Sequence, residues 1–245
     1  MGDRKKTSGK KYNARTYIGW GATAAAIIVL IVAAVFLLGK GSPVADLEGF
    51  TPLDEENLTQ GITLESKELT LDAVGIYTGK YVEDGSDADI ENIPAILVTN
   101  HGTSMIETAE IQLHLGEKGI ALFEMTDIPA GKSALVLDQN KLQCVEGVTA
   151  EYWTDFVKFA EDVWIEKEKF DITGTQGALT LKNKTDEEYG FVYAFYKNKL
   201  TKDIYFGGIT YRATFEQVPA QGEEEADALH YEPETSEVMQ IKIVE

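Results

Sequence analysis

The chain has 245 residues, a formal net charge of −19 at pH 7 and a single cysteine, Cys144. Of its 22 Lys and Arg and 41 Asp and Glu, seven bases and one acid lie in residues 1–40, which leaves 15 bases and 40 acids, or −25, for residues 41–245. A surface this acidic repels polyanions and excludes nucleic-acid binding as a function. One cysteine cannot form an intrachain disulfide, which among extracytoplasmic proteins is more typical of bacteria than of eukaryotes.

An uncharged stretch at residues 17–38 reads YIGWGATAAAIIVLIVAAVFLL. A helix of this length rises about 33 Å at about 1.5 Å per residue, enough to cross a hydrocarbon core of about 30 Å. Six basic residues precede it in the polar tail 1–16, and an acidic region follows it. The stretch is too long for the apolar part of a cleavable signal peptide. The positive-inside rule therefore predicts a single-pass signal anchor in the cell membrane, with residues 1–16 in the cytoplasm and the rest outside.

The part outside the membrane is expected to be mainly β. Residues 39–60 are rich in acids and turn formers and predict a short stalk. From Ile62 onward, apolar and polar residues alternate with period 2 between turn residues, as in half-buried strands. Strands are predicted at 62–64, 69–74, 76–82, 95–99, 109–115, 120–125, 133–137, 163–173, 178–183, 190–196, 204–218 and 238–244, with a glycine turn at 116–119.

One segment, Thr149–Trp164, breaks this alternation. Its apolar residues Trp153, Phe156, Val157 and Ala160 fall at i, i+3, i+4 and i+7, the spacing of one face of a helix. Thr149 is a suitable N-cap for such a helix. We therefore predict a helix here that bridges two β domains and packs through its two tryptophans.

The β region also repeats itself. Both copies contain a strand that ends in Asn, a polar turn, a second strand, and later a Phe-Glu pair followed by Pro-Ala and Gly. The copies run from Ile96-Leu-Val-Thr-Asn100 to Phe123-Glu and Pro129-Ala-Gly131, and from Leu179-Thr-Leu-Lys-Asn183 to Phe215-Glu and Pro219-Ala-Gln-Gly222. The offset of about 83–92 residues is the size of a small β-sandwich. We predict tandem β-sandwich modules at residues 61–148 and 149–245.

The second copy resembles the FxLYD-type and related Ig-like modules of bacterial envelope proteins. The residues that carry the resemblance are Leu181-Lys-Asn183-Lys-Thr185, Val192-Tyr-Ala-Phe195-Tyr196-Lys197 and Pro219 with Gly222. The first copy departs from it, because Leu113-His-Leu115 replaces the aromatic pair. The resemblance implies a small Ig-like β-sandwich with a binding or structural role, often anchored at the cell surface, and no catalytic residues.

An acidic loop is the candidate metal site. Asp84, Asp87, Asp89 and Glu91 follow one another in a glycine-containing segment. Calcium binds several oxygen ligands from a flexible loop, and extracellular sites can have affinities of about 10⁻⁴–10⁻³ M. The spacing lacks the twelfth-position Glu of an EF-hand, so a solvated loop is the alternative. A second acidic run, Glu223–Glu225 with Asp227, Glu232 and Glu234, has the same two interpretations.

An enzyme hypothesis rests on three residues. Membrane-anchored sortases are also β-rich surface proteins and use a His, a Cys and an Arg, and His114, Cys144 and Arg212 occur here in that order. The Thr-Leu-x-Thr-Cys context of the sortase cysteine is missing, so a buried, inert cysteine is the alternative. We expect no enzyme and no cofactor.

The sequence therefore predicts a non-enzymatic, membrane-anchored extracytoplasmic module for protein–protein interaction or assembly in a bacterial cell-surface complex, with a protein partner in the cell envelope. The alternative is an adhesive or ligand-binding module for wall glycan or calcium. Exposed aromatic side chains in a groove, at Tyr152, Trp153, Trp164 or Tyr205, would favour that alternative.

Overall fold

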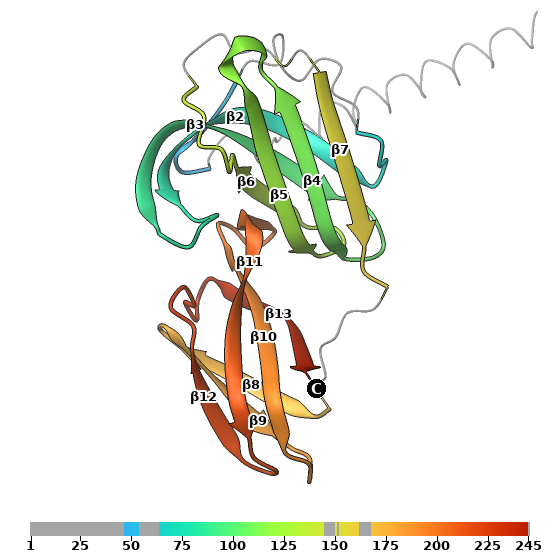
Figure 1. Cartoon of the computed structure of the whole chain (residues 1–245), viewed down its shortest axis with the longest axis vertical. Helices are drawn as coiled ribbons and strands as arrows, with labels where there is room; N and C mark the ends of the chain where they lie inside the picture. Colours follow the sequence, from blue (N-terminus) through green and yellow to red (C-terminus); the bar gives the residue numbers. More distant parts are fainter. Residues whose placement is uncertain (1–46, 54–63, 145–149, 151, 162–167, 245) are drawn as a thin grey trace, which may run out of the picture. The chain divides into compact units, whose positions relative to one another are not determined.

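The computed structural model describes residues 47–53, 64–144, 150, 152–161 and 168–244, all within one compact unit that spans Val44–Glu245 (Figure 1). Within these residues, no helix is long and apolar enough to cross a membrane. The predicted membrane-spanning stretch at 17–38 and the basic tail at 1–16 lie outside the described residues.

The described chain is almost entirely β, which confirms that the protein is mainly β, as predicted. We call residues 47–161 the N-terminal half and residues 168–244 the C-terminal half. The N-terminal half contains β1 (Phe50–Pro52), β2 (Leu69–Tyr81), β3 (Ala88–Asn100), β4 (Ile106–His114), β5 (Ile120–Ile128), β6 (Ser133–Leu137) and β7 (Tyr152–Phe159), with a 3-10 turn at Gly116–Lys118. The C-terminal half contains β8 (Phe170–Thr175), β9 (Ala178–Asn183), β10 (Tyr189–Lys199), β11 (Ile204–Val218), β12 (Glu223–Asp227) and β13 (Ser236–Val244).

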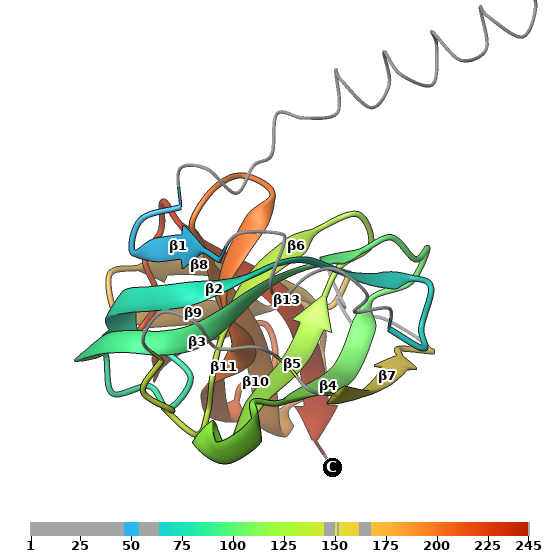
Figure 2. The same cartoon turned by 90° about the horizontal axis from the view of Figure 1, so that it is seen from above.

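The two halves have the same strand order. In the N-terminal half, strands β2-β3-β6 form one layer and β5-β4-β7 the other. In the C-terminal half, β8-β9-β12 and β11-β10-β13 are arranged in the same way. Each half is therefore a two-layer β-sandwich, and Figure 2 shows β7 at the edge of the β4–β5 layer.

One sheet runs through both halves. The first strands of the N-terminal half and the last strands of the C-terminal half form a seven-stranded sheet with the order β1-β2-β3-β6-β11-β10-β13. The halves meet where Ile204–Phe206 of β11 pair in parallel with Ser133–Leu135 of β6, the single parallel pairing in the described sheets. Because this pairing is made of backbone hydrogen bonds, the halves are joined by more than the connection along the chain.

A glycine pair lets β11 pass from β6 to the rest of the C-terminal half. Gly207 has φ +83°, a conformation that glycine adopts without strain. A Cβ atom on Gly208 would lie 1.9 Å from the carbonyl oxygen of Glu124 in β5. Only a glycine allows the two backbones to approach this closely.

Three hydrophobic clusters fill the described part of the molecule. One lies between the two layers of the N-terminal half and includes Phe123, and another lies between the layers of the C-terminal half and includes Phe215. The third covers the other face of β2, β3 and β6 and contains Ile204 from β11. Tyr205 and Met239 of the C-terminal half belong to the first cluster, so the two halves share apolar packing as well as a sheet.

The predicted bridging helix at Thr149–Trp164 is wrong. Residues 152–159 form β7, which pairs antiparallel with β4. The helix would bury Phe156, but this side chain is 57% exposed, whereas Trp153, Val157 and Phe159 pack against the core with strand periodicity. The aromatic and β-branched residues of the segment also favour a strand. Trp164 lies outside the described residues.

Other strand predictions differ less from the structure. The strands at 133–137, 178–183 and 204–218 have the predicted bounds, whereas 69–74 and 76–82 form one strand through Gly75, over which the Phe50 ring packs. Phe50–Pro52, which we expected in the stalk, form β1 on the edge of the large sheet. The acidic run Glu223–Asp227 is the edge strand β12, where charged side chains remain in solvent.

Candidate functional site

The structure places its most unusual polar residues where the two halves meet. Glu83 follows β2, Asp127 lies on β5 and Lys197 lies on β10, and all three are buried. We call them the buried charge cluster. Buried charges are costly unless they are paired and hydrogen-bonded, so the partners of each of the three residues decide what the cluster does.

The Lys197 ammonium is fully buried and saturated with acceptors. Its Nζ donates to the carbonyl oxygens of Gly208 (2.6 Å), Ile209 (2.8 Å) and Thr126 (3.1 Å). An ammonium has three hydrogens, so these bonds use all of its donors. Burial lowers the pKa of Lys197 to about 8, while the charges of Glu83 and Asp127 oppose this shift.

The Glu83 carboxylate also bridges the halves, but it belongs to the N-terminal half, whereas Lys197 belongs to the C-terminal half. It accepts hydrogen bonds from the backbone N–H groups of Leu137 (2.9 Å), Gly208 (2.9 and 3.0 Å) and Ile209 (3.2 Å). Burial raises the pKa of Glu83, and the backbone donors and Lys197 act against that rise. One carboxylate thus holds β6 of the N-terminal half and β11 of the C-terminal half together.

Asp127 completes the cluster. The side-chain amide of Gln240 on β13 donates to its carboxylate, and beside it the hydroxyl groups of Thr126 and Thr210 are 2.8 Å apart. Burial raises the pKa of Asp127, with Thr210, Lys197 and Gln240 acting in the opposite direction. The cluster therefore consists of one cation and two carboxylates whose hydrogen bonds come from both halves, which suits a structural junction.

The sequence did not predict that Lys197 is buried, and a local distortion of β10 explains why. Val192, Ala194 and Tyr196 alternate into the core, so strict period 2 would turn Lys197 outward. The strand register shifts between Phe195 and Tyr196 on one side and between Tyr196 and Asn198 on the other. Such bulges re-aim side chains, and here Lys197 turns inward.

The predicted calcium ligands are not brought together. Asp84 forms an ion pair with Lys141 (2.7 Å) and Asp89 with Lys80 (2.7 Å), Asp87 is hydrogen-bonded to Nδ1 of His230 (3.1 Å), and Glu91 is exposed on β3. The hydrogen bond from Lys141 is the main cause that lowers the pKa of Asp84 to about 2. Among the described residues, no three His, Cys, Asp or Glu side chains are grouped so that they could hold a metal ion.

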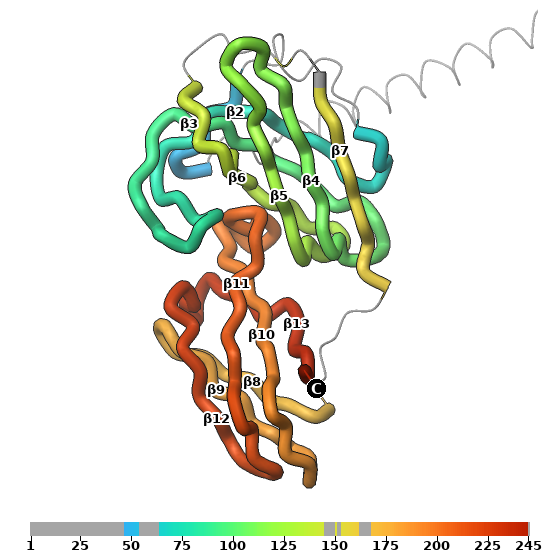
Figure 3. Tube along the Cα trace, in the orientation of Figure 1, coloured from blue at the N-terminus to red at the C-terminus, as the bar shows by residue number. Residues whose placement is uncertain are grey.

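This acidic loop instead contacts the C-terminal half. It connects β2 and β3. Its Glu83 accepts a hydrogen bond from the Gly208 N–H, and its Asp87 is hydrogen-bonded to His230. Tyr211 of β11 donates its hydroxyl to the Val82 carbonyl (3.1 Å), and its ring stacks on His230 with 4.4 Å between centroids. Figure 3 shows the β2–β3 hairpin bending toward β11.

The three residues of the sortase hypothesis lie in different surroundings. Cys144 is buried in the core of the N-terminal half, where burial raises the pKa of its thiol, the opposite of what a thiolate nucleophile requires. Arg212 lies on β11 with its guanidinium 4.6 Å from the ring centre of Tyr193, and His114 ends β4.

Aromatic and basic side chains gather on the outer face of the C-terminal half. Phe191, Tyr193 and Phe195 alternate outward along β10, and Phe191 is 43% exposed. Arg212 lies over Tyr193, and the Lys242 Nζ is 5.4 Å from the ring centre of Phe195. We call these five residues the aromatic–cation face. Arg212 is the only arginine in residues 41–245, so this face differs in composition from the acidic remainder.

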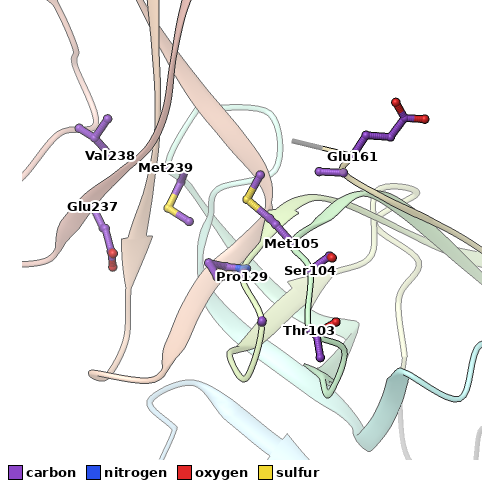
Figure 4. Close-up of a pocket in the computed structure, with 10 residues that line it drawn as sticks. Thr103, Ser104, Met105, Pro129, Glu161, Glu237, Val238 and Met239 are labelled. Atoms are coloured by element: carbon purple, nitrogen blue, oxygen red, sulfur yellow. The ribbon is translucent and has the colours of Figure 1, made fainter. Parts of the chain in front are cut away.

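A groove lies between the halves on the side of β13. We call it the junction groove; it encloses about 410 Å³ and is lined by Thr103, Ser104, Met105, Pro129, Ala130, Ala160 and Glu161 of the N-terminal half and by Glu237, Val238 and Met239 of the C-terminal half. Figure 4 shows the Met105 and Met239 side chains near each other in it.

Buried hydrogen bonds fix the wall of the junction groove. The Asn100 amide donates to the carbonyls of Ser104 and Ile128 (both 2.9 Å), so it holds the β3–β4 and β5–β6 turns together. The Ala160 N–H donates to the Met105 carbonyl (2.8 Å) and attaches the end of β7. The groove therefore has a wall of defined geometry.

Of the aromatic residues proposed for ligand binding, the structure describes the side chains of Trp153 and Tyr205, and both pack in the core of the N-terminal half. Trp153 packs against the core of the N-terminal half. Tyr205 is buried and donates its hydroxyl to Glu237 (3.0 Å), behind the junction groove. Among the described aromatic side chains, the exposed ones are Phe156 on β7 and Phe191 on β10, and the sequence predicted neither as a surface residue.

Comparison of the chain with protein-family models, with curated proteins and with solved structures finds no match. The functional assignment therefore depends on the sequence and on the surfaces described above.

Proposed function

We propose that this chain is a membrane-anchored, extracytoplasmic protein–protein interaction module of a bacterial cell-surface complex, and that it is not an enzyme. In this proposal residues 17–38 cross the bilayer with the N-terminus in the cytoplasm. Residues 47–244 form two tandem Ig-like sandwiches outside the cell. The uncharged 22-residue stretch and the basic tail before it support the anchor and its orientation.

The observation that carries the proposal is the aromatic–cation face. Tyr, Phe and Arg are enriched at protein–protein interfaces, and the residues that dominate binding energy are often Tyr and Arg. Here Phe191, Tyr193 and Phe195 form a row on β10, and Arg212 and Lys242 cover two of the rings. A solvent-facing row of this kind adds little to the core of the sandwich, so a contact with a partner is the better explanation.

The junction between the halves supports this function. The buried charge cluster and the β6–β11 pairing join the two sandwiches through side-chain and backbone bonds. An interface presented on a constrained scaffold loses less conformational entropy when it binds.

Photo-crosslinking in intact cells tests the proposal. A photoreactive amino acid at position 191 should capture one reproducible envelope protein, and Arg212→Glu should reduce that product about tenfold or more. The matched control is the same amino acid at position 156, because Phe156 is also an exposed aromatic but lies on β7 of the other half.

Equal capture at positions 191 and 156, or no product at position 191, would reject the aromatic–cation face as the contact surface. A product that consists of cell-wall glycan rather than protein would support the adhesive alternative instead. Stacking of an aromatic row on a sugar would then explain the same surface.

A further inference from the structure

We propose that the junction groove binds the side chain of a lysine or arginine in a basic peptide segment. The proposal rests on the proposed function, because the segment would belong to a protein partner. It assigns a second binding site, separate in residues from the aromatic–cation face.

The floor of the groove suits an aliphatic stem. Met105 and Met239 are buried beneath it, and Pro129 and Val238 add apolar surface at its sides. Methionine side chains are unbranched and polarizable, so they adapt to the shape of a ligand. Lysine and arginine bury their methylene stems along apolar surface while the charged end remains in polar surroundings.

The rim of the groove supplies the opposite charge. Glu161 at the end of β7 and Glu237 on β13 line it from the two halves, and both are exposed. Lys199 (3.2 Å) and the Tyr205 hydroxyl (3.0 Å) both donate to Oε2 of Glu237. No hydrogen bond from the described residues reaches Oε1 of Glu237, which leaves an acceptor for an incoming ammonium or guanidinium.

An organic cation fits this groove better than a metal ion. Calcium takes six to eight oxygen ligands. The groove offers two carboxylates and the hydroxyl groups of Thr103 and Ser104, and the part of the chain that the structure describes contains no metal-binding group of three or more acidic, His or Cys residues. A lysine or arginine needs fewer ligands and also fills the apolar floor.

The charge of the whole extracytoplasmic region favours the same class of partner. With a net charge of −25, residues 41–245 attract basic segments at long range and increase their rate of encounter. Binding should therefore weaken as the ionic strength rises.

The test uses the full chain in lipid nanodiscs and a fluorescent nine-residue peptide of Gly and Ser with one central lysine. Fluorescence anisotropy should show saturable binding of this peptide, and acetylation of the lysine should weaken it about tenfold or more. Glu161→Gln with Glu237→Gln should weaken it to a similar extent. Glu91→Gln, which removes one exposed acid on β3, should change the affinity less than about twofold.

Equal binding of the lysine and acetyl-lysine peptides would overturn the proposal, and so would a double variant that binds as well as Glu91→Gln. Displacement of the peptide by about 1 mM Ca²⁺ but not by Na⁺ at equal ionic strength would also overturn it, because the groove would then be a metal site. Thermal melts of the variants serve to show that they are folded.

The crosslinking experiment separates this proposal from the proposed function. Loss of peptide selectivity with intact capture at position 191 would reject the junction groove alone. Peptide binding without capture at position 191 would reject the aromatic–cation face and retain the groove.

Discussion

The two halves share one strand order, but a different hairpin is long in each half. In the N-terminal half, β2 and β3 have 13 residues each, whereas their counterparts β8 and β9 have six. In the C-terminal half, β10 and β11 have 11 and 15 residues, whereas their counterparts β4 and β5 have nine. The long hairpin is therefore β2–β3 in the N-terminal half and β10–β11 in the C-terminal half.

Both extensions reach the other half. The β2–β3 hairpin brings Glu83 to the backbone of Gly208 and Ile209. The β10–β11 hairpin brings Ile204–Phe206 alongside β6, and Lys132 forms an ion pair with Asp203 next to this pairing (2.6 Å). The difference between the halves thus explains how two similar sandwiches form one unit.

What the halves keep in common is a buried asparagine that joins two turns. Asn100 and Asn183 both donate to the carbonyl four residues later and to a carbonyl beside the Pro-Ala turn, and both accept from the N–H two residues later. The Asn and the Pro-Ala turn of the sequence repeat thus form the same local structure in both halves.

The largest loss of stability is expected when Lys197, the buried cation between the two halves, is replaced. Lys197→Met would leave Glu83 and Asp127 buried without their cation and three carbonyls without a donor. Leaving a buried charge without compensation costs about 3–5 kcal/mol, so urea denaturation of the full chain should show a loss of this size. Lys199→Met, which removes the half-buried partner of exposed Glu237, should cost less than about 1 kcal/mol.

The pH dependence of the free energy of unfolding provides a second test of the Lys197→Met variant. The pKa of Lys197 is about 8 in the folded protein and about 10.4 in an unfolded chain. Between these values the unfolded state holds more protons, so the free energy of unfolding should rise with pH. This rise between pH 7.5 and 9.5 should be absent from Lys197→Met, and equal slopes in the two proteins would contradict the assignment.

A smaller effect should be shared by the two halves. Asn100→Ala removes three side-chain hydrogen bonds and Asn183→Ala removes four, which at about 1 kcal/mol each should cost about 3–4 kcal/mol. Differential scanning calorimetry of both variants measures the two losses of stability, which can then be compared. If one of them lost less than a third as much stability as the other, the two turns would not be equivalent.

The smallest effect is expected in the acidic loop. Asp87→Asn breaks the half-exposed contact with His230 and should lower the free energy of unfolding by less than about 1 kcal/mol. Because three of the four carboxylates of the loop have separate protein partners, about 1 mM Ca²⁺ should not raise the unfolding midpoint. A midpoint that rises with calcium in the wild type but not in Asp87→Asn would restore the calcium hypothesis.

Local sequence was sufficient for most strands and for the internal repeat. Period-2 alternation depends on neighbours along the chain, so 133–137, 178–183 and 204–218 were predicted with their observed bounds. The segment 149–164 was not, because its apolar residues at i, i+3, i+4 and i+7 indicated one face of a helix. Burial against β4, which leaves Phe156 exposed, decided for a strand.

The sequence by itself determined the mainly β fold, the acidity of residues 41–245 and the uncharged stretch at 17–38, since each depends on composition or short-range periodicity. The tertiary structure alone decided how the acidic loop is used, because its carboxylates find Lys141, His230 and the β11 backbone far away in the chain. It also decided the inward turn of Lys197 and the lining of the junction groove. Both arise from strand register and from contacts between halves, which no local pattern encodes.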